Sequence, residues 1–543
     1  MYKNKITQAL MVSASFAVAA TSFSSFAAQV PSDVKLADKQ ELVRGNGTEP
    51  ESLDPQKVSG VPESNVIRDL LEGLVNQDSK GNLVPGAAKS WETADNKTWI
   101  FHLREDAKWS NGDPVTADDF VYTWRRLADP KTASPYASYI QMTTMANAED
   151  IIAGKKPADT LGVEAVDAHT LKVTLDKPVS YFASMLVHTS MKPVNQKVVE
   201  KFGDDWTKVG NYVSNGAYKL DKWVVNERIV LTRNDNYWDN KDTVINKVTY
   251  LPIENQVAGM NRFLAGELDI TYEMPNEHFK RLEKEYPQDV KVTPYLCSYY
   301  YEFNTKRKPF DDANVRKALS YAIDRDVLAK FIVGKGETPA YNFTPLATNG
   351  LEVAMPEYSK LDQKQRLAKA KELLKAAGYD QNNPLQFNLL YNTSENHKKI
   401  AVAISSMWKK GLGVKAVLEN QEWKSYLDSK RQGNFDVSRA GWCGDYNEAS
   451  TFLAIMHSGH SQNYPKYSSV AYDKAIDDAI LAKSDAQRAA DYKQAEAQLA
   501  EDMPIMPIYH YVNARLVNPQ LGGYPMENPE DNIYSKDMYF KAK

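Results

Sequence analysis

Hydrophobic and polar residues alternate along this chain in two different periods, and the clearest example covers residues 385–418. A period of two indicates a strand, and apolar residues three and four apart indicate one face of a helix. The unit begins with a strand over 385–391, which is followed by capping side chains at 392–394. Stop signals at Gly411 and Gly413 and a strand over 414–418 close the unit. The helix between them carries these apolar residues on one face: Ile400, Ala403, Ile404, Met407 and Trp408. Such a strand–helix–strand unit predicts a right-handed crossover.

The same two periods recur along the rest of the chain, which predicts an α/β or α+β protein. We expect one long helix over 311–330, capped by Asp311 or Asp312, with Val315 and Leu319 in its buried stripe. The other predicted elements are strands over 98–103, 170–176, 228–232 and 247–253, a turn at 111–112 and a helix that opens at 114–119. No Gly/Ser-rich linker separates these elements, so we expect domains that are joined by several short crossings.

The first 27 residues have the pattern of a cleaved secretory signal. Lys3 and Lys5 form a basic start, residues 6–20 carry no charge, and small residues stand at Ser25 and Ala27. The apolar stretch is shorter than the roughly 20 residues that span a bilayer, which argues against a membrane anchor. We therefore predict cleavage after Ala27 and export, which in a Gram-negative bacterium means the periplasm.

The charge balance of the mature chain is mildly acidic. Removing Lys3 and Lys5 from the 66 basic side chains leaves 64 against 70 acidic ones, a formal charge of −6. A nucleic-acid surface needs clustered Lys and Arg, so nucleic acid is not an expected partner.

The two cysteines, Cys297 and Cys443, are most simply one disulfide in an exported chain. Two free buried thiols are the alternative. A metal site is disfavoured, because neither cysteine has a Cys or His nearby to complete a ligand set.

The common catalytic motifs do not occur in the sequence, which contains no HExxH, no GxSxG and no Walker phosphate loop. The lone Gly334-Lys335-Gly336 lacks the third glycine of a dinucleotide site, and the eight histidines are scattered. We therefore predict a protein that is not an enzyme and that needs no cofactor and no metal. A paired-carboxylate hydrolase stays open, because carboxylates are too frequent for spacing to single out a pair.

One segment, residues 438–448, carries unusual chemistry. It follows a predicted strand start at Phe435 and combines a cation, a glycine, an indole, a cysteine and a carboxylate. Such a segment can pair with an extended peptide and place a charge at its end, whereas composition alone favours an ordinary strand-to-loop transition.

Several motifs favour a peptide-binding role for that segment over an ordinary transition to a loop. Together they resemble the periplasmic oligopeptide-binding proteins, the receptor subunits of oligopeptide ABC permeases. The resemblance covers nearly the whole mature chain. Besides 435–448, it rests on residues 51–55, 99–104, 108–112, 115–117, 133–139, 215–218, 236–238, 315–319, 322–325 and 511–515.

The resemblance implies an α/β, bilobal fold of the periplasmic-binding-protein type (type II) with an additional third domain. The implied boundaries are 28–71, 196–296 and 513–543 for lobe I, 72–195 for domain II and 297–512 for lobe III. The implied partners are short peptides and an inner-membrane ABC permease that takes them up, and the implied state is a monomer.

The resemblance also implies a site in which the ligand backbone adds as a strand to the protein. Asp445 matches the partner of the ligand ammonium, and Arg439, His397 and Lys430 match groups for its carboxylate. The implied backbone contacts are Ser59 to Val61 and Gly441, Trp442 and Cys443, and the implied pocket walls are Tyr136, His188, Tyr272, Tyr300, Trp423 and Trp442.

Three positions depart from the pattern that the resemblance implies. Ser59 replaces a usual glutamate, Lys430 a usual arginine, and Val333 a common lysine, which leaves the preferred peptide length open. Residues 72–77 and 392–397 also look like the related murein-peptide receptors, which lack the two cysteines. A murein-peptide receptor is therefore the alternative, and a nickel or haem carrier and a peptidase are more distant rivals.

Overall fold

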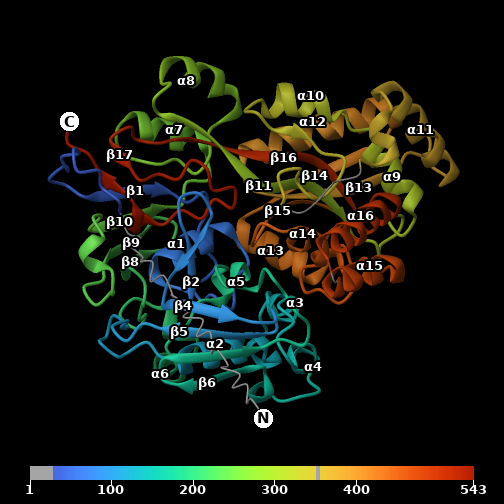
Figure 1. Cartoon of the computed structure of the whole chain (residues 1–543). Coiled ribbons are helices and arrows are strands. Elements are labelled where there is room, and N and C mark those ends of the chain that lie inside the picture. The colour runs from blue at the N-terminus through green and yellow to red at the C-terminus, as the bar shows by residue number, and fades with distance from the viewer. Residues whose placement is uncertain (1–27, 350–354, 483) are drawn as a thin grey trace, which may run out of the picture.

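The computed structural model describes residues 28–349, 355–482 and 484–543, so the predicted signal at 1–27 lies outside the described residues. The chain folds around three larger sheets, which we call the β1, β4 and β11 regions together with the helices beside them (Figure 1). In Figure 1 the β4 region lies below and the β11 region, yellow to red, lies at the upper right.

The β1 region contains a four-stranded sheet in the order β1, β10, β9, β8. β1 and β10 pair in parallel, and the other neighbours are antiparallel. The strands are β1 (Glu41–Gly45), β10 (Lys247–Leu251), β9 (Arg228–Arg233) and β8 (Tyr218–Val224), with helices α1 (Val61–Leu70), α7 (Gln256–Leu264) and α8 (Phe279–Glu285) and the small pair β17 (Leu521–Gly522) and β18 (Tyr539–Phe540).

The β4 region contains an antiparallel sheet in the order β4, β5, β7, β6. Its strands are β4 (Ala88–Thr93), β5 (Thr98–Leu103), β7 (Thr170–Thr174) and β6 (Val163–Asp167), with the hairpin β2 (Val75–Gln77) and β3 (Leu83–Pro85) and helices α2 (Ala117–Ala128), α3 (Ala137–Met142), α4 (Ala148–Ile152), α5 (Phe182–Met185) and α6 (Gln196–Phe202). β5 alternates as predicted, with Trp99, Phe101 and Leu103 buried. α2 begins at the predicted point, where the Asp119 carboxylate accepts from the Thr116 backbone N–H over 2.8 Å.

The β11 region contains a six-stranded mixed sheet in the order β12, β16, β11, β15, β13, β14. Its strands are β12 (Thr338–Pro339), β16 (Ile505–Leu516), β11 (Val290–Phe303), β15 (Val437–Cys443), β13 (Gln386–Asn392) and β14 (Lys415–Gln421). Its helices are α9 (Ala313–Tyr321), α10 (Arg325–Val327), α11 (Gln363–Ala376), α12 (Glu395–Leu412), α13 (Trp423–Gln432), α14 (Ser450–Leu453), α15 (Val470–Leu481) and α16 (Asp485–Asp502).

The predicted crossover unit is confirmed, since β13 and β14 pair in parallel with α12 between them. Ser394 caps α12 by accepting from the His397 N–H, and Gly413 ends it with a left-handed φ of 75°. Gly411, predicted as a second stop signal, lies inside the helix instead. Ile400, Ile404 and Trp408 are fully buried, as the helical spacing predicts.

The single helix predicted over 311–330 is wrong. Asp312 caps α9 as expected, but α9 ends at Tyr321, and Asp324 then caps the new short helix α10 by accepting from the Val327 N–H. The buried Arg325 side chain donates to the carbonyl oxygens of Ser320, at the end of α9, and of Ala340, in a later loop.

The strands β11 and β16 are long enough to serve two regions. They pair with each other from Val290–Leu516 to Glu302–Ile505, with register shifts after Pro294 and Tyr299. The predicted boundaries at 296/297 and 512/513 fall inside these two strands, so the β1 and β11 regions share continuous backbone there.

Candidate functional site

A cavity of about 240 Å³ lies where the three regions meet. Twelve of the fourteen residues that the sequence placed in a binding site line it: Ser59, Val61, Tyr136, His188, Tyr272, His397, Trp423, Arg439, Gly441, Trp442, Cys443 and Asp445. These residues come from segments nearly 400 positions apart, so the fold brings them together.

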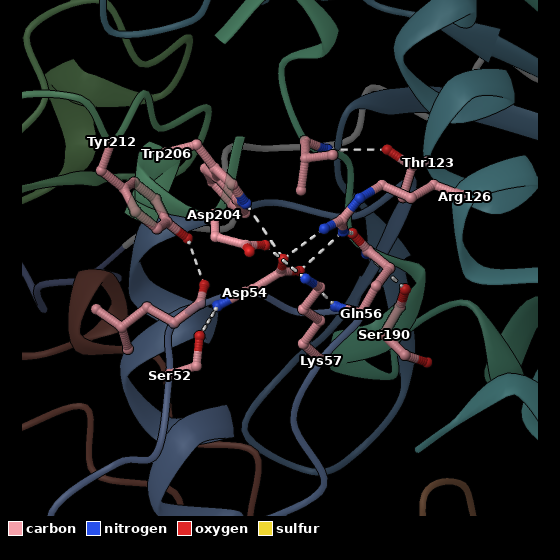
Figure 2. Close-up of polar contacts among 12 residues, drawn as sticks. Ser52, Asp54, Gln56, Lys57, Thr123, Arg126, Ser190, Asp204, Trp206 and Tyr212 are labelled. Carbon is pink, nitrogen blue, oxygen red and sulfur yellow. Dashed lines mark hydrogen bonds and ion pairs between the residues drawn. The ribbon is translucent and has the colours of Figure 1, made fainter. Parts of the chain in front are cut away.

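One wall of the cavity is held by a buried polar cluster around Asp54 (Figure 2). The Asp54 carboxylate accepts two hydrogen bonds from the Arg126 guanidinium, at 2.8 and 2.5 Å, and one from Trp206 Nε1 at 3.2 Å. Gln56 adds a link, because its side-chain amide donates to the Ser190 carbonyl over 3.0 Å. Because both carboxylate oxygens accept hydrogen bonds, the loop that leads to Ser59 is held against the β4 region.

The start of α1 approaches the β11 region closely at Gly60. A Cβ atom there would lie 2.0 Å from Glu63 Oε2 and 3.0 Å from the Trp423 ring, so no larger residue fits without a shift. Trp423 Nε1 donates to Glu63 Oε1 over 3.3 Å, a contact between the β11 and β1 regions. Burial raises the pKa of Glu63 to about 7, because the backbone N–H of Glu51 and the Trp423 indole compensate only in part.

The opposite wall is the strand β15, and the C-terminal part of one of its edges is open. β15 pairs with β11 along its whole length, from Val437 to Cys443. Within the described residues its other neighbour, β13, pairs with it at Val437 and Ser438 alone. The Arg439 carbonyl accepts from the Tyr426 hydroxyl, whereas the edge from Gly441 to Cys443 faces the cavity with backbone groups that can accept an added strand. β15 starts at Val437 rather than at Phe435, and it runs through the segment that the sequence left as a transition to a loop.

Asp445 follows this strand and meets two side chains of the β4 region. Its Oδ1 lies 3.3 Å from the Tyr136 hydroxyl and 3.3 Å from His188 Nε2. The Ser190 N–H donates to His188 Nδ1 over 3.2 Å, which leaves Nε2 as the ring nitrogen that carries the proton and faces Asp445. The Tyr136 ring stacks on His188, with ring centroids 4.7 Å apart. Burial and the Asp445 charge raise the pKa of Tyr136 well above its usual value, so it is a neutral donor.

Arg439 and His397 form a second polar end of the cavity. The Arg439 guanidinium donates to the Tyr511 hydroxyl over 2.6 Å and to Asn392 Oδ1 over 3.3 Å, and lies 4.9 Å from the centre of the Tyr299 ring. Within the described residues its Nε has no hydrogen-bond partner. Burial, with the charge of Arg439 next, lowers the pKa of His397 far below its usual value and keeps it neutral. This end presents a buried cation that can take a carboxylate.

Two predicted residues are not among those that line the cavity. Lys430 is buried and forms an ion pair with Glu302 at 3.1 Å, and its ammonium lies 4.7 Å from the centre of the Tyr464 ring. Tyr300 points into the core, with its ring centre 5.0 Å from that of Phe343. Val333, at the end of a π-helix that follows α10, is a core residue as well. The charge of Lys430 is therefore already matched by a carboxylate of the protein.

Several cavity residues had no signal in the sequence. Among them are Arg68, Gln256, Asn513 and Glu530, which line the same cavity. Glu530 lies in a loop, Arg68 and Gln256 lie near the ends of α1 and α7, and Asn513 lies on β16, and in none of these places does a periodic pattern indicate binding.

Across residues 28–349, 355–482 and 484–543, no grouping of His, Cys, Asp and Glu could hold a metal ion. The same part of the chain contains no helix long and apolar enough to cross a membrane.

The sequence matches the bacterial extracellular solute-binding proteins, family 5 Middle, over residues 82–464. The chain belongs to this family. It is 57% identical over 514 residues to the periplasmic oligopeptide-binding protein OppA of Salmonella typhimurium, covering 94% of this chain and 95% of the relative. The fold class and the family resemblance expected from the sequence are thereby confirmed.

Two solved structures of family-5 receptors are similar to this protein over nearly its whole length. The OppA of Haemophilus influenzae in complex with the peptide RPPGFSPFR superposes with a TM-score of 0.92 at 51% identity, covering 94% of this chain and 100% of that one. The murein tripeptide-binding protein MppA of Escherichia coli gives a TM-score of 0.93 at 51% identity, with the same coverage. These relatives are solute-binding receptors rather than enzymes, and the OppA and MppA proteins of enteric bacteria are named as periplasmic.

The cavity is closed by contacts between regions. Arg431 of α13 donates to both oxygens of Glu51 in the β1 region, over 2.7 and 3.0 Å. The Gln462 amide donates to the Pro135 carbonyl over 2.6 Å. The unliganded open form of MppA superposes with a TM-score of 0.67, at 51% identity and covering 94% of this chain and 99% of that one. The lower score agrees with a closed arrangement of the present chain.

The disulfide is confirmed: Cys297 on β11 and Cys443 on β15 are joined. They face each other directly in the register of the two strands. The bridge therefore fastens the end of β15 whose other edge is open.

Proposed function

We propose that this protein is a periplasmic receptor that binds short peptides in the closed cavity and delivers them to an ABC-type oligopeptide permease for uptake. The observation that carries the proposal is the open edge of β15 between a carboxylate and a cation. A peptide in the extended conformation offers backbone hydrogen bonds to such an edge and opposite charges at its two ends.

In this proposal Asp445 takes the ligand ammonium, with Tyr136 and His188 holding the carboxylate in place. Gly441 to Cys443 and the facing loop at Ser59 to Val61 receive the ligand backbone. Arg439 and His397 take the carboxylate end. The walls at Tyr272, Trp423 and Trp442 contact side chains. Lys430 is given no direct role, because Glu302 already neutralises it.

Domain motion completes the proposed cycle. The segments 28–71, 196–296 and 513–543 would move as one lobe against 297–512, with 72–195 attached to the first. A ligand that touches both lobes binds the closed state better than the open one and shifts the equilibrium toward closure. We further propose export with cleavage after Ala27, a monomeric state and no cofactor.

The direct test is the identity of the bound ligand. Protein purified without denaturation and examined by native mass spectrometry should carry a mixture of short peptides. Protein that is unfolded, dialysed and refolded should then bind tri-alanine in a calorimeter and leave it intact. Cleavage of the peptide would indicate a peptidase, and no binding of any free peptide would refute the proposal.

The second candidate is a receptor for murein peptides, favoured by the TM-score of 0.93 to MppA. A single muropeptide species in the native mass spectrum would establish this alternative, and a mixture of peptides would exclude it.

A further inference from the structure

The loop between β17 and β18 brings an additional carboxylate to the cavity. Glu530 lies in this loop, in the β1 region, and lines the same cavity as Asp445, which belongs to the β11 region. The two carboxylates therefore reach the cavity from different regions of the fold.

An amide network holds the Glu530 side chain. Asn532 Nδ2 donates to its Oε2 over 3.4 Å, and the nearby Gln77 side chain and Asn447 backbone lower the pKa of its carboxyl group. Asn532 Nδ2 also donates to Gln77 Oε1 over 2.6 Å, and this second hydrogen bond holds the Asn532 side chain in place. Asn447 is two residues from Asp445, and the charge of Asp445 raises the pKa of Glu530, so Glu530 lies at the end of the cavity where Asp445 lies.

The balance of charge at this end is incomplete. Arg515 and Asp531, which also line the cavity, neutralise each other at 2.6 Å. Among the described residues neither Asp445 nor Glu530 lies within 4 Å of a lysine or arginine nitrogen. A ligand that brings a cation supplies what this end lacks.

We propose that Glu530 is a second binding residue for the positively charged end of the ligand, acting beside Asp445. The inference rests on the proposed function. It adds a residue that binds the ligand ammonium from the lobe that does not contain Asp445. A cation between the two carboxylates is contacted by both lobes and so favours the closed state.

The protonation of Glu530 supports the assignment and supplies a readout. Burial raises the pKa of Glu530 to about 8, the Gln77 hydrogen bond opposes the rise, and the charge of Asp445 adds to it. The other groups that face it are Arg68, Tyr139 and Tyr534, and His188 lies against Asp445. With the cavity closed and no cation in it, the carboxyl group is therefore mostly protonated at pH 6.5, and an arriving ammonium favours its ionised form. Peptide binding should release a proton.

The experiment is calorimetry of tri-alanine and N-acetyl-tri-alanine between pH 6.0 and 7.0, in buffers of different ionisation enthalpy. In this range a peptide ammonium stays largely protonated. For the wild type we expect release that approaches one proton per tri-alanine, and an affinity that rises by up to about tenfold per pH unit. The acetylated peptide, which lacks the cation, should release none.

Glu530→Gln should abolish the proton release and weaken tri-alanine binding at pH 7.0 by at least about fivefold. Glu527→Gln is the matched control, because Glu527 is an exposed acid of the same loop, and it should behave as the wild type. Unchanged proton release in Glu530→Gln would assign the proton to another group, such as His188, and overturn the inference. Release that is missing in the wild type would overturn it too. No saturable binding of tri-alanine by the wild type would instead refute the proposed function.

Discussion

Asp445→Asn removes the negative charge from one end of the cavity and changes little else. The asparagine has the same shape, and its Oδ1 can still accept from the Tyr136 hydroxyl and lie against His188 Nε2, both of which are 3.3 Å from the carboxylate. The Asp445 side chain is 10% exposed, so a bound ammonium would exchange most of its water for this group.

The magnitude follows from charge and distance. Two unit charges about 4 Å apart attract by about 4 kcal/mol at an effective dielectric constant of 20. The amide dipole of asparagine still attracts the ammonium and so retains part of this energy. The variant also avoids the cost of desolvating a carboxylate when the ligand binds. We therefore expect peptide binding to weaken by about 2–3 kcal/mol, which is about 30- to 150-fold in Kd.

The assay is isothermal calorimetry with refolded, ligand-free protein and two ligands, tri-alanine and N-acetyl-tri-alanine. If Asp445 pairs with the ammonium, the variant should lose affinity for the free peptide and keep that for the acetylated one, so that a double-mutant cycle gives a large coupling energy. An equal loss for both peptides would mean that Asp445 acts on closure alone. Unchanged affinity for tri-alanine would refute the reasoning.

Three further predictions concern closure and stability. Arg431→Gln should break the bidentate contact with Glu51 and speed peptide dissociation by about fivefold, since this ion pair is partly exposed and contributes about 1 kcal/mol; stopped-flow dissociation that is no faster than in the wild type would contradict this. Glu63 has a pKa of about 7 in the folded protein against an ordinary 4.5, so folding takes up a proton and stability should fall by about 3 kcal/mol as the pH rises from 4.5 through 7; urea unfolding of Glu63→Gln should lack this loss, and an identical pH profile would refute the assignment. Replacing both Cys297 and Cys443 by serine should lower the free energy of unfolding by up to about 4–5 kcal/mol, because the bridge spans 146 residues; an unchanged urea midpoint would show that the strand pairing alone holds this end of β15.

The local pattern predicted single elements well and failed where a side chain from elsewhere intervened. The 385–418 unit was predicted because its capping and periodic residues lie within one continuous stretch. The break after Tyr321 was missed because it depends on carbonyls at Ser320 and Ala340 that meet the buried Arg325, and one of these lies in a later loop. Contacts of this kind leave no periodic trace in the sequence.

The candidate site divides in the same way. Asp445, Arg439 and Gly441 were named from one segment and its family resemblance, and they line the cavity. Lys430 comes from the adjacent helix and was expected to face the ligand, yet its side chain points to Glu302. Glu530 was not predicted at all, because a lone acid in a polar loop looks like a solvated surface group.

The sequence by itself determined the α/β alternation, the helix caps, the predicted export signal and the family. These depend on neighbours within a few positions or on motifs that can be read directly. Only the tertiary structure decided which side of β15 stays unpaired, which cations are already neutralised and which carboxylates share a cavity. The physical reason is that burial and charge pairing depend on distances across the fold, and residues such as Glu51 and Arg431, or Asp445 and Glu530, become neighbours only when the chain folds.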